Sequence, residues 1–585
     1  MTQSDIEADV LVIGCGPSGL LATLSLASAG NTVLAVTKHP QLAPTPRAHL
    51  TNQRSFEIFR DFGLEDQARA LAIPYREMPD AIFWESLVGE EYGRMRGLGA
   101  DAEGLANGLW ASPCEVADLP QHLLEPMLFE AGVKAGADVR FGTEFLSLDQ
   151  DDQGVTARLL DRRSGDTVRV RAQYLIGADG GRSVVAKAID LPMEGAHEIG
   201  ESLNILFDCD LSAYVAHRPA LLYFMVRSAG QDGGPGLGIL RCIKPWSSWM
   251  LIRGYAPGQK VPIPSDEEAV AVVRDYLGVA HLTVRITGVD PWTMNASHAA
   301  TYQRDRVFCV GDAVHRHVPS NGLGSNTGMQ DAYNLGWKLD LVLKGKAGSG
   351  LLDTYSSERV PVGRQIVERA TASMVTYGPI LEAVGALDDV AQTSGGGAAA
   401  LKDSGAAGVA RRRQLRNAID EKKYEFRTRG VELNQFYRSD AIVDEGQEPA
   451  ETGADLQLFY RPTSSPGARV PHAWVQRHGR SVSILDLVGK GRFVLLTGIA
   501  GGVWREVTAS VCQRLGTDIT IVTIGPGGDY EDLYFEWADL RETAEDGCLL
   551  VRPDGHIAWR CMVSGNSTDA EAELAAAMSR ILAKE

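Results

Sequence analysis

The pattern of hydrophobic positions at the start of the chain predicts a compact βαβ unit. Residues 8–13 form a run that is apolar apart from Asp9 and typical of a buried strand, and the small residues of 18–29 indicate a helix. Residues 32–36 indicate a second strand. A strand, a helix and a strand in this order build a parallel sheet. We therefore expect the chain to open with an α/β nucleotide-binding fold.

Beyond about residue 185 the pattern changes to short segments in which apolar and polar positions alternate. These segments lie at residues 203–207, 221–226, 237–243 and 249–253. Such alternation predicts an antiparallel sheet with one covered face.

A strand of the buried type returns at residues 306–310, followed by a glycine-rich loop and a helix at about 323–343. The first domain is therefore expected to be discontinuous. Residues 352–437 have helical spacing, broken by a glycine-rich segment at 394–397 that is expected to form a loop. A small α/β domain is predicted from about residue 454, because helical stretches alternate there with strand-like runs at residues 492–497, 518–524 and 548–552.

Length and charge narrow the classes of function. A chain of 585 residues is too long for one core, and 44% hydrophobic with 23% charged residues is typical of a globular protein. The net charge of −18 gives no general attraction to nucleic acid or anionic lipid, so neither partner is expected. No apolar stretch reaches the roughly 18 residues of a membrane span. The first residues lack the basic region of a secretion signal, so we expect a cytoplasmic protein.

The sequence contains no metal-binding pattern. Its eight cysteines are scattered without a Cys-x-x-Cys motif, which predicts neither a zinc cluster nor a dithiol redox pair. His315 and His317 flank a turn that has no carboxylate at metal-ligand spacing. No metal site is expected.

A glycine motif lies between the first predicted strand and the first predicted helix. Gly14, Gly16 and Gly19 allow a tight turn there and let a pyrophosphate approach the N-terminus of the helix. The alternative is a glycine-rich turn without a ligand. The acidic residue that usually holds a ribose near the end of the second strand is replaced by Thr37 and Lys38. A lysine there could favour the 2′-phosphate of NADP, so a simple dehydrogenase stays an alternative at this point.

Two later segments, residues 174–183 and 306–317, are each a strand that ends in a Gly/Asp turn. Together with the first motif they resemble the three-part signature of flavoprotein aromatic hydroxylases. In that family the carboxylate of the Gly-Asp turn, here Gly311 and Asp312, binds the flavin ribitol. The Asp-Gly segment at Asp179 is associated with FAD and with the reduced nicotinamide. The resemblance implies FAD as cofactor and NADPH or NADH as co-substrate.

The resemblance covers essentially the whole chain. The chain is similar to phenol hydroxylases of the 2,4-dichlorophenol 6-monooxygenase and 2-hydroxybiphenyl 3-monooxygenase type. The segments that carry this similarity are residues 44–54, 117–121, 311–326 and 467–472. It implies a mixed α/β and α+β fold: a Rossmann-like FAD-binding domain, an inserted antiparallel substrate sheet and a thioredoxin-like C-terminal domain. Without Cys-x-x-Cys, that last domain is expected to be structural. The FAD-binding domain is expected to comprise residues 1–185 and 301–350, with the substrate-binding sheet at 186–300 between them. A helical segment with a linker is expected at 351–453, and the thioredoxin-like C-terminal domain at 454–585.

The same resemblance implies a reaction and a set of flavin contacts. A phenol is ortho-hydroxylated to a catechol with NAD(P)H and O₂, through a flavin C4a-hydroperoxide. The loop at residues 318–324 is expected to face the flavin pyrimidine edge, where the following helix N-terminus would stabilise the anionic reduced flavin. The remaining expected flavin contacts are Arg47, Gln121, Pro319, Gly322, Leu323 and Gly324.

A base is needed to deprotonate the phenol, and His49 and Asp118 are the candidates. A histidine titrates in the useful range, and a carboxylate beside it would orient the ring and support its protonated form. The corresponding positions of related phenol hydroxylases lie near the substrate hydroxyl. The structural alternatives are an N-cap role for Asp118, which precedes Leu-Pro-Gln, and a packed histidine at 49.

The predicted sheet supplies the candidates for the substrate wall. An aromatic stripe at this spacing is more often core than pocket, and Arg241, which the resemblance places near the flavin, is alternatively an ion-pair partner. These candidates are Tyr223, Phe224, Leu237, Ile239, Arg241 and Trp292. The expected partners are a small phenol, O₂ and further copies of the chain in a homo-oligomer. Two other functions stay open: hydroxylation or epoxidation of a larger polyketide-type aromatic, and a catalytically silent FAD-binding protein.

Overall fold

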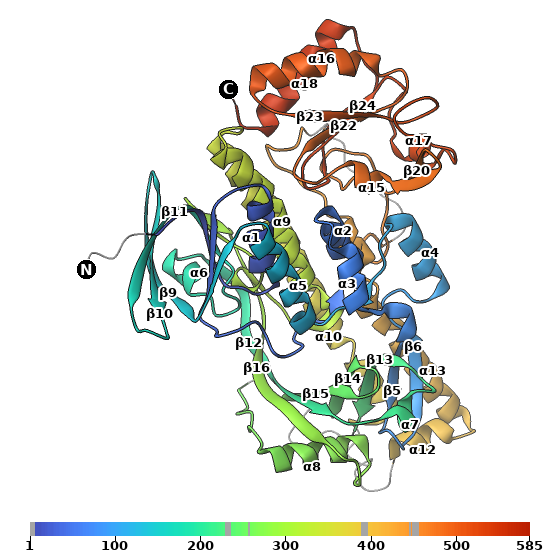
Figure 1. Ribbon diagram of the computed structural model, residues 1–585. Coiled ribbons are helices and arrows are strands. Elements are labelled where there is room, and N and C mark those ends of the chain that lie inside the picture. Colours follow the sequence, from blue (N-terminus) through green and yellow to red (C-terminus); the bar gives the residue numbers. More distant parts are fainter. Residues whose placement is uncertain are drawn as a thin grey trace.

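The computed structural model describes residues 6–227, 236–255, 258–387, 396–443, 446 and 455–584. Figure 1 shows a nucleotide-binding domain at the centre, a second large sheet below it and the C-terminal domain above it. Within the described residues, no helix has both the length and the apolar character needed to cross a membrane.

The first domain is built on a sheet with β1 (Ile6–Ile13) at its centre. This strand lies between β2 (Val33–Thr37) and β11 (Thr167–Gly177) and is parallel to both. The strands in spatial order are β17 (Gln303–Arg304), β18 (Val307–Cys309), β11 (Thr167–Gly177), β1 (Ile6–Ile13), β2 (Val33–Thr37) and β8 (Asp138–Phe141), with β9 (Thr143–Asp151) and β10 (Gly154–Asp161) attached to β11. The predicted βαβ unit is confirmed, because α1 (Pro17–Ser28) connects β1 to β2.

The first domain is discontinuous in sequence, as predicted. β18 pairs with β11 in parallel although the second sheet lies between them along the chain. The helix that follows, α9 (Gly324–Leu343), packs against α1, which also contacts α5 (Gln121–Lys134). The C-terminal half of the nucleotide fold therefore returns to the same core as the first strand.

The second sheet contains more strands than the alternation predicted. Its spatial order is β19 (His315–Arg316), β16 (Arg285–Ala299), β12 (Met193–Asp208), β15 (Ser248–Tyr255), β14 (Leu237–Lys244), β13 (Ala220–Val226), β5 (Asp80–Trp84) and β6 (Glu91–Arg96). All its pairs are antiparallel except β13 with β5. Alternation could not predict β5, because all five of its residues are buried and polar and apolar positions do not alternate along it.

Helices follow the first domain, as the spacing of residues 352–437 predicted. α11 (Gly378–Ala383) packs on α13 (Ala406–Phe426), and α13 also contacts β6 of the second sheet. Part of the glycine-rich segment expected as a loop lies outside the described residues, while Gly396 begins α12. The helices are α10 (Thr354–Val375), α11 (Gly378–Ala383), α12 (Gly396–Lys402), α13 (Ala406–Phe426) and α14 (Arg429–Leu433).

The C-terminal domain is a four-stranded sheet covered by helices. β22 is parallel to β23 and antiparallel to β24, which is antiparallel to β25. The three strand-like runs predicted from the sequence correspond to the first three of these strands, and the topology is compatible with the thioredoxin-like domain that we predict. The elements are β22 (Phe493–Thr497), α16 (Gly502–Leu515), β23 (Ile519–Thr523), β24 (Cys548–Val551), β25 (Ile557–Cys561) and α18 (Ser567–Ile581).

A cluster of four buried charges joins the C-terminal domain to α9 and α10. Glu358 Oε2 lies 2.8 Å from Lys338 Nζ, and Glu358 Oε1 lies 2.6 Å from Arg552 Nη1. Arg552 Nη2 in turn lies 2.6 Å from Asp554 Oδ2. We call these four residues the interface cluster.

Candidate active site

The turn after β1 leaves space for a ligand at one of its three glycines. A Cβ on Gly14, where φ is +111°, would lie 2.2 Å from the Ala178 carbonyl oxygen, and one on Gly19 would lie 2.0 Å from the Gly14 oxygen. A Cβ on Gly16 would meet nothing within 4 Å. Gly14 and Gly19 are therefore required by chain packing, whereas Gly16 leaves open space at the N-terminus of α1, which suits a pyrophosphate.

The loop with Asp312 is held from behind by a buried carboxylate. Asp331 Oδ2 accepts the Gly311 backbone N–H at 3.0 Å and lies 2.7 Å from His315 Nε2. Arg359 Nε donates to the other oxygen of Asp331 at 2.8 Å. The Asp312 side chain itself is exposed. Asp331 thus holds a turn whose Asp312 carboxylate is exposed, and the ribitol contact of Asp312 stays a prediction.

The loop at residues 318–324 lies against the segment that carries His49. A Cβ on Gly322, where φ is +65°, would lie 2.6 Å from Leu50 Cδ2. Pro319 is exposed, and Gly324 begins α9. Leu323 differs from its neighbours because its side chain is buried with Ile366 and Val431. Any contact of Leu323 with a flavin would therefore be made by its backbone.

Gln121 connects the loop with Arg47 to the start of α5. Its backbone N–H donates to the Ala48 oxygen at 2.7 Å, and its side-chain Oε1 accepts the Ala48 N–H at 3.3 Å. Its Nε2 donates to Glu125 at 2.6 Å. Arg47 is exposed beside this connection. Gln121 therefore orders the loop from which the Arg47 cation projects, and direct flavin contacts of both residues stay predictions.

His49 and Asp118 come together in a small sheet. β3 (Leu50–Thr51) pairs with β7 (Ala117–Asp118), and β7 also pairs with β4 (Ile73–Pro74). The Leu119 N–H donates to the His49 oxygen at 2.7 Å, which extends the β3–β7 pairing. His49 Nδ1 lies 3.8 Å from Asp118 Oδ2, and both side chains are buried. Arg241 reaches from β14 and forms an ion pair with the other Asp118 oxygen. We call His49, Asp118 and Arg241 the site cluster.

Burial and the Arg241 cation keep His49 neutral. Burial above all, together with Arg241, lowers the pKa of His49 to about 4, against the opposing effect of Asp118. Burial acts to raise the pKa of Asp118, yet Arg241 and His49 together hold it below its usual value. Asp118 thus acts in the expected direction and favours a protonated imidazole, but burial and Arg241 outweigh it, so the imidazole is neutral. A neutral imidazole can accept a proton.

Several polar atoms of the site cluster have no hydrogen-bond partner. Among the described residues, no hydrogen bond reaches His49 Nδ1, His49 Nε2, Asp118 Oδ2 or Arg241 Nε, although all four atoms are buried. Buried polar atoms are normally hydrogen-bonded, so four neighbouring atoms without a hydrogen-bond partner indicate a binding site for a polar ligand. The N-cap alternative for Asp118 is not supported, because Pro120 is the N-cap of α5. The ion-pair alternative for Arg241 is confirmed.

Comparison with known proteins decides the family. The family described as FAD binding domain matches residues 7–370, and the one described as aromatic-ring hydroxylase, C-terminal, matches residues 463–584. The chain belongs to the FAD-dependent aromatic-ring hydroxylases. This hydroxylase is therefore a flavin-dependent monooxygenase with FAD as cofactor and NAD(P)H as co-substrate. The dehydrogenase and the catalytically silent protein are no longer alternatives.

Relatives and solved structures cover the whole hydroxylase. It is 46% identical to 2,4-dichlorophenol 6-monooxygenase of Delftia acidovorans, over 99% of this chain and 98% of that protein. It is 42% identical to phenol 2-monooxygenase of a Pseudomonas strain, over 95% of this chain and 90% of that protein. The crystal structure of the flavin-dependent monooxygenase PieE with FAD and substrate superposes with a TM-score of 0.94 at 41% identity and covers 99% of this chain and 100% of that one.

Asp179 of the hydroxylase has a local structural role. Its carboxylate accepts hydrogen bonds from the Ser183 hydroxyl at 2.5 Å and from the backbone N–H groups of Val184 and Val185 at 2.6 and 3.2 Å. It thereby satisfies the first two N–H groups of α6 (Val184–Ala188), whose N-cap is Ser183, next to the turn at Gly14. Both carboxylate oxygens are occupied, so a direct contact of Asp179 with the cofactor stays a prediction.

Two of the aromatic candidates for the substrate wall belong to the core instead. Tyr223 is fully buried, its ring stacks on Trp84 at 4.8 Å, and its hydroxyl donates to the Arg218 carbonyl oxygen. Phe224 is fully buried and stacks on Phe83 at 4.8 Å. Neighbouring residues of a strand point to opposite faces. Tyr223 therefore faces away from Arg241, and the prediction that it lines the pocket is wrong.

The other wall candidates share the Arg241 face of the sheet. Phe224 pairs with Ile239 and Val226 with Leu237 across β13 and β14, and cross-strand partners point to the same side. Leu237 and Ile239 are partly buried against α11 and α13. Trp292 is half-buried, and its Nε1 donates to Asn204 Oδ1 at 3.3 Å. Whether these residues contact substrate stays a prediction.

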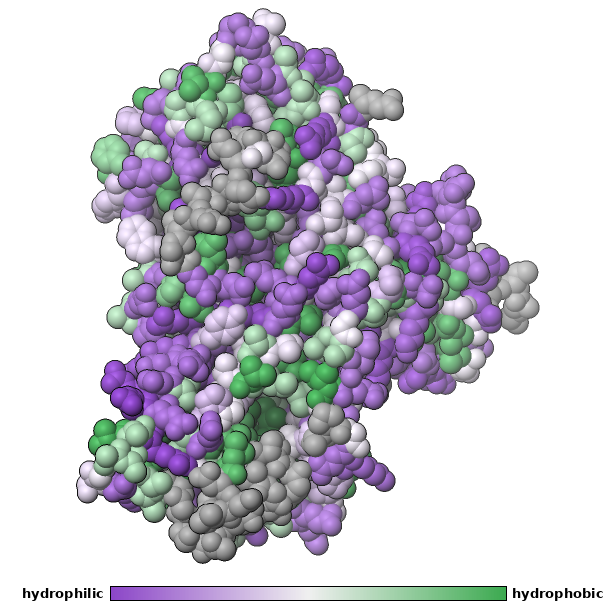
Figure 2. Space-filling model, turned by 180° about the vertical axis from the view of Figure 1, so that it is seen from behind, coloured by the Kyte–Doolittle hydropathy of each residue, from purple (hydrophilic) through white to green (hydrophobic). Residues whose placement is uncertain are grey.

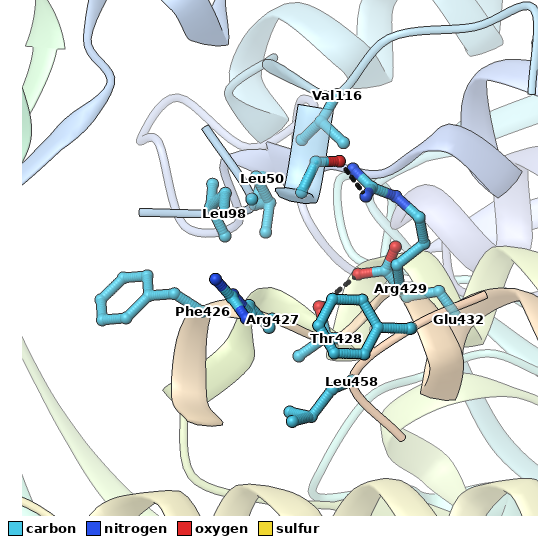
Figure 3. A pocket seen from close by; sticks show the side chains of 12 residues that line it. Leu50, Leu98, Val116, Phe426, Arg427, Thr428, Arg429, Glu432 and Leu458 are labelled. Carbon is cyan, nitrogen blue, oxygen red and sulfur yellow. Dashed lines mark hydrogen bonds between the residues drawn. The ribbon is translucent and has the colours of Figure 1, made fainter. Parts of the chain in front are cut away.

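A hollow of about 390 Å³ lies beside Leu50 of β3, the residue that follows His49 (Figure 3). Leu50 and Val116 line one side of it, and Phe426 comes from the end of α13. In Figure 3 Arg429 reaches the Gly104 carbonyl oxygen, while the buried carboxylate of Glu432 accepts the Thr428 hydroxyl at 2.6 Å. Hydrophobic residues also gather around a hollow in the half of the molecule with the second sheet (Figure 2).

The sequence did not indicate this lining. Leu50 and Val116 directly adjoin His49 and residue 117, so nearness to the matching segments was a usable signal for them. No such signal existed for Phe426 or Glu432, which reach the hollow from a distant part of the chain. Among the described residues, no group of three or more His, Cys, Asp and Glu side chains is placed to hold a metal ion.

Proposed function

We propose that this hydroxylase converts a phenol into a catechol, with NAD(P)H and O₂ as co-substrates. The observation that carries the proposal is the set of unpartnered buried atoms in the site cluster, next to a neutral His49. A phenol hydroxyl can donate to such an imidazole, and its oxygen can accept from Arg241 Nε. The identities of 46% and 42% with a dichlorophenol and a phenol monooxygenase support this substrate class.

The residues of this chain prepare the ring for oxygen. As the phenol O–H bond breaks, its proton moves to a ring nitrogen of His49, and the electron pair stays on the phenolate, which enriches the ortho carbon. Asp118 stabilises the imidazolium that forms, and Arg241 keeps Asp118 ionised. Reduced FAD, when bound, supplies the activated oxygen. One oxygen atom enters the ring, the other leaves as water, and NAD(P)H provides the two electrons.

The cofactor is expected to be held by residues from five segments. The open space at Gly16 suits the pyrophosphate, and the exposed Asp312 suits the ribitol. The isoalloxazine ring would lie between the loop at 318–324 and the site cluster, where buried groups exclude water. The proposed contacts are Gly14, Gly16, Gly19, Arg47, Gln121, Asp179, Gly311, Asp312, Pro319, Gly322, Leu323 and Gly324.

Larger fused rings are the second candidate substrate class. The chain is 31% identical to tetracenomycin A2 monooxygenase-dioxygenase of Streptomyces glaucescens, over its whole length. The identity to the phenol enzymes is higher, which favours a single ring. We also infer a cytoplasmic enzyme, because its co-substrate NAD(P)H is a cytoplasmic metabolite, and a homo-oligomer remains our prediction.

A substrate panel tests the proposal. The holoenzyme is mixed with phenol, 2,4-dichlorophenol or a fused-ring phenol, with NADH or NADPH, under ¹⁸O₂. Single-ring phenols should stimulate nicotinamide oxidation and yield a catechol that carries one ¹⁸O atom. Anisole is the matched control, since its methyl ether has no proton to give, and it should yield no hydroxylated product. Product from the fused-ring compound alone, or from no phenol, would contradict the proposal.

A further inference from the structure

One side chain connects the strand next to His49 with the loop expected to face the flavin. Asn326 lies in the first turn of α9 and is 1% exposed. Its Nδ2 donates to the Leu50 carbonyl oxygen at 2.8 Å and to the Gly322 carbonyl oxygen at 2.7 Å. Its Oδ1 accepts the Asn52 backbone N–H at 3.0 Å and the Ser55 hydroxyl at 2.7 Å.

The four hydrogen bonds use the full capacity of the Asn326 amide. A primary amide has two N–H donors and an oxygen with two lone pairs. Aspartate has the same shape but lacks both donors, and it would place a charge against two carbonyl oxygens. Alanine and leucine lack all four bonds. No other residue of the same size can therefore make this connection.

The two segments that Asn326 joins carry different parts of the site. Leu50 directly follows His49 and pairs with Asp118 in the small sheet. Gly322 belongs to the loop at 318–324 and lies against the Leu50 side chain. Apart from that van der Waals contact, the amide of Asn326 is a direct polar link between the two.

We propose that Asn326 is a positioning residue that sets the distance between His49 and the flavin loop. The inference rests on the proposed function, because His49 matters only if it receives the phenol proton. Transfer of oxygen to the ring needs the substrate and the cofactor in one geometry, whereas reduction of the cofactor by NAD(P)H does not involve His49. An error of 1 Å in such a geometry can cost about a hundredfold in rate. Loss of the connection should therefore uncouple the two half-reactions.

The test compares two buried asparagines of the same helix. Asn334 is also 1% exposed, and its Nδ2 donates to Glu358 at 2.8 Å and to Asp554 at 3.2 Å, at the C-terminal interface. Asn326→Ala and Asn334→Ala holoenzymes are compared for Tm, FAD content, phenol-stimulated NAD(P)H oxidation, and the ratio of catechol to H₂O₂. Asn326→Asp, which keeps the shape, replaces Asn326→Ala if the latter does not fold.

The expected result separates positioning from stability. Both alanine variants should lose Tm, but only Asn326→Ala should lower the ratio of catechol to H₂O₂, by about tenfold or more, while NAD(P)H oxidation continues. Wild-type coupling in Asn326→Ala would overturn the inference. An equal loss of coupling in Asn334→Ala would also overturn it, because a general loss of stability would then explain both.

A second measurement does not depend on the substrate. The Leu119 N–H donates to the His49 oxygen, and the Gln121 N–H donates to the Ala48 oxygen, both at 2.7 Å. Hydrogen exchange of these two amides in the resting holoenzyme should be faster in Asn326→Ala and unchanged in Asn334→Ala. If the wild type hydroxylates no phenol, the proposed function fails, and this exchange still decides whether Asn326 holds the strand. Unchanged exchange at both amides would overturn the inference.

Discussion

The interface cluster and the site cluster are both buried groups of charged side chains, yet they differ in how completely they are paired. In the interface cluster Glu358 meets both Lys338 and Arg552, and none of the four charged side chains retains a buried atom without a partner. In the site cluster both ring nitrogens of His49 are open. Burial of charge is tolerated when partners satisfy it. The interface cluster, in which every charge is paired, can therefore serve as a structural contact between domains. The site cluster, whose imidazole lacks hydrogen-bond partners, is suited to bind a ligand.

The largest expected effect comes from removing the imidazole of His49, the proposed base. His49→Ala should slow catechol formation by about 10² to 10⁴, because general-base assistance is lost, while NAD(P)H oxidation continues and yields H₂O₂. The measurement is the ratio of catechol to H₂O₂. The matched control is His472→Ala: burial lowers the pKa of His472 to about 4 as well, but its Nδ1 lies 2.8 Å from the Ser483 hydroxyl. Normal coupling in His49→Ala would return this histidine to a packing role.

Breaking the completed cluster should cost stability instead. Arg552→Ala leaves Glu358 and Asp554 buried without their shared partner, which typically costs about 3 to 5 kcal/mol. The midpoint of chemical denaturation should fall accordingly. Arg505→Ala is the control, because its ion pair with Asp529 is exposed and such pairs contribute about 1 kcal/mol or less. Equal shifts in both variants would show that the interface cluster has no special role.

The sequence predicted the parts of the fold whose signals are local. The turn at Gly14 follows an apolar strand and precedes a helix of small residues, so spacing alone located it. Alternation located the second sheet but not its buried face, because a period of two does not say which face meets the core. For this reason the sequence pattern wrongly assigns Tyr223 to the substrate pocket rather than to the core.

The candidate site was predictable only in part, because its members meet through tertiary contacts. Resemblance to phenol hydroxylases indicated His49 and Asp118, and the structure brings them within reach of each other. The ion pair of Asp118 with Arg241 joins residues far apart in sequence, so the resulting neutral state of His49 could not be derived from spacing. The four hydrogen bonds of Asn326 could not be predicted either, because three of them join residues that are far apart in sequence.

A smaller effect is expected where a single exposed carboxylate meets the cofactor. Asp312→Ala should weaken FAD retention by about 1.5 to 3 kcal/mol, the usual contribution of a charge-assisted hydrogen bond. The apoprotein should keep a normal circular dichroism spectrum, because Asp331 still holds the loop from behind. Asp149→Ala removes another exposed carboxylate of the same domain and should leave the dissociation constant of FAD unchanged. Equal FAD affinity in both variants would show that Asp312 does not reach the ribitol.

The pH dependence of coupling should report on the charges in the site cluster. His49 accepts the proton only when neutral, so coupling should fall as the pH drops through its pKa of about 4. Arg241 lowers that pKa, so Arg241→Met should move this acidic limb upward by roughly one unit. Arg241→Lys keeps the cation and should leave the limb in place. The measurement is the ratio of catechol to H₂O₂ between pH values on either side of the limb, and a downward shift in Arg241→Met would contradict the assigned charges.

The smallest effect is expected in the C-terminal domain, where two of the three thiols are buried like the interface cluster but carry no charge. Burial raises the pKa of Cys561 to about 11 and that of Cys548 well above its usual value, while Cys512 is only partly buried and its pKa is also raised by burial. Thiol–disulfide exchange needs a thiolate, so these thiols should be inert. Replacing all three by serine should leave turnover and coupling intact, at a stability cost of about 1 kcal/mol from altered packing. The assay is insulin reduction by the wild type and the triple variant, with hydroxylation measured in parallel. Reductase activity in the wild type that disappears in the variant would show that this domain has redox chemistry after all.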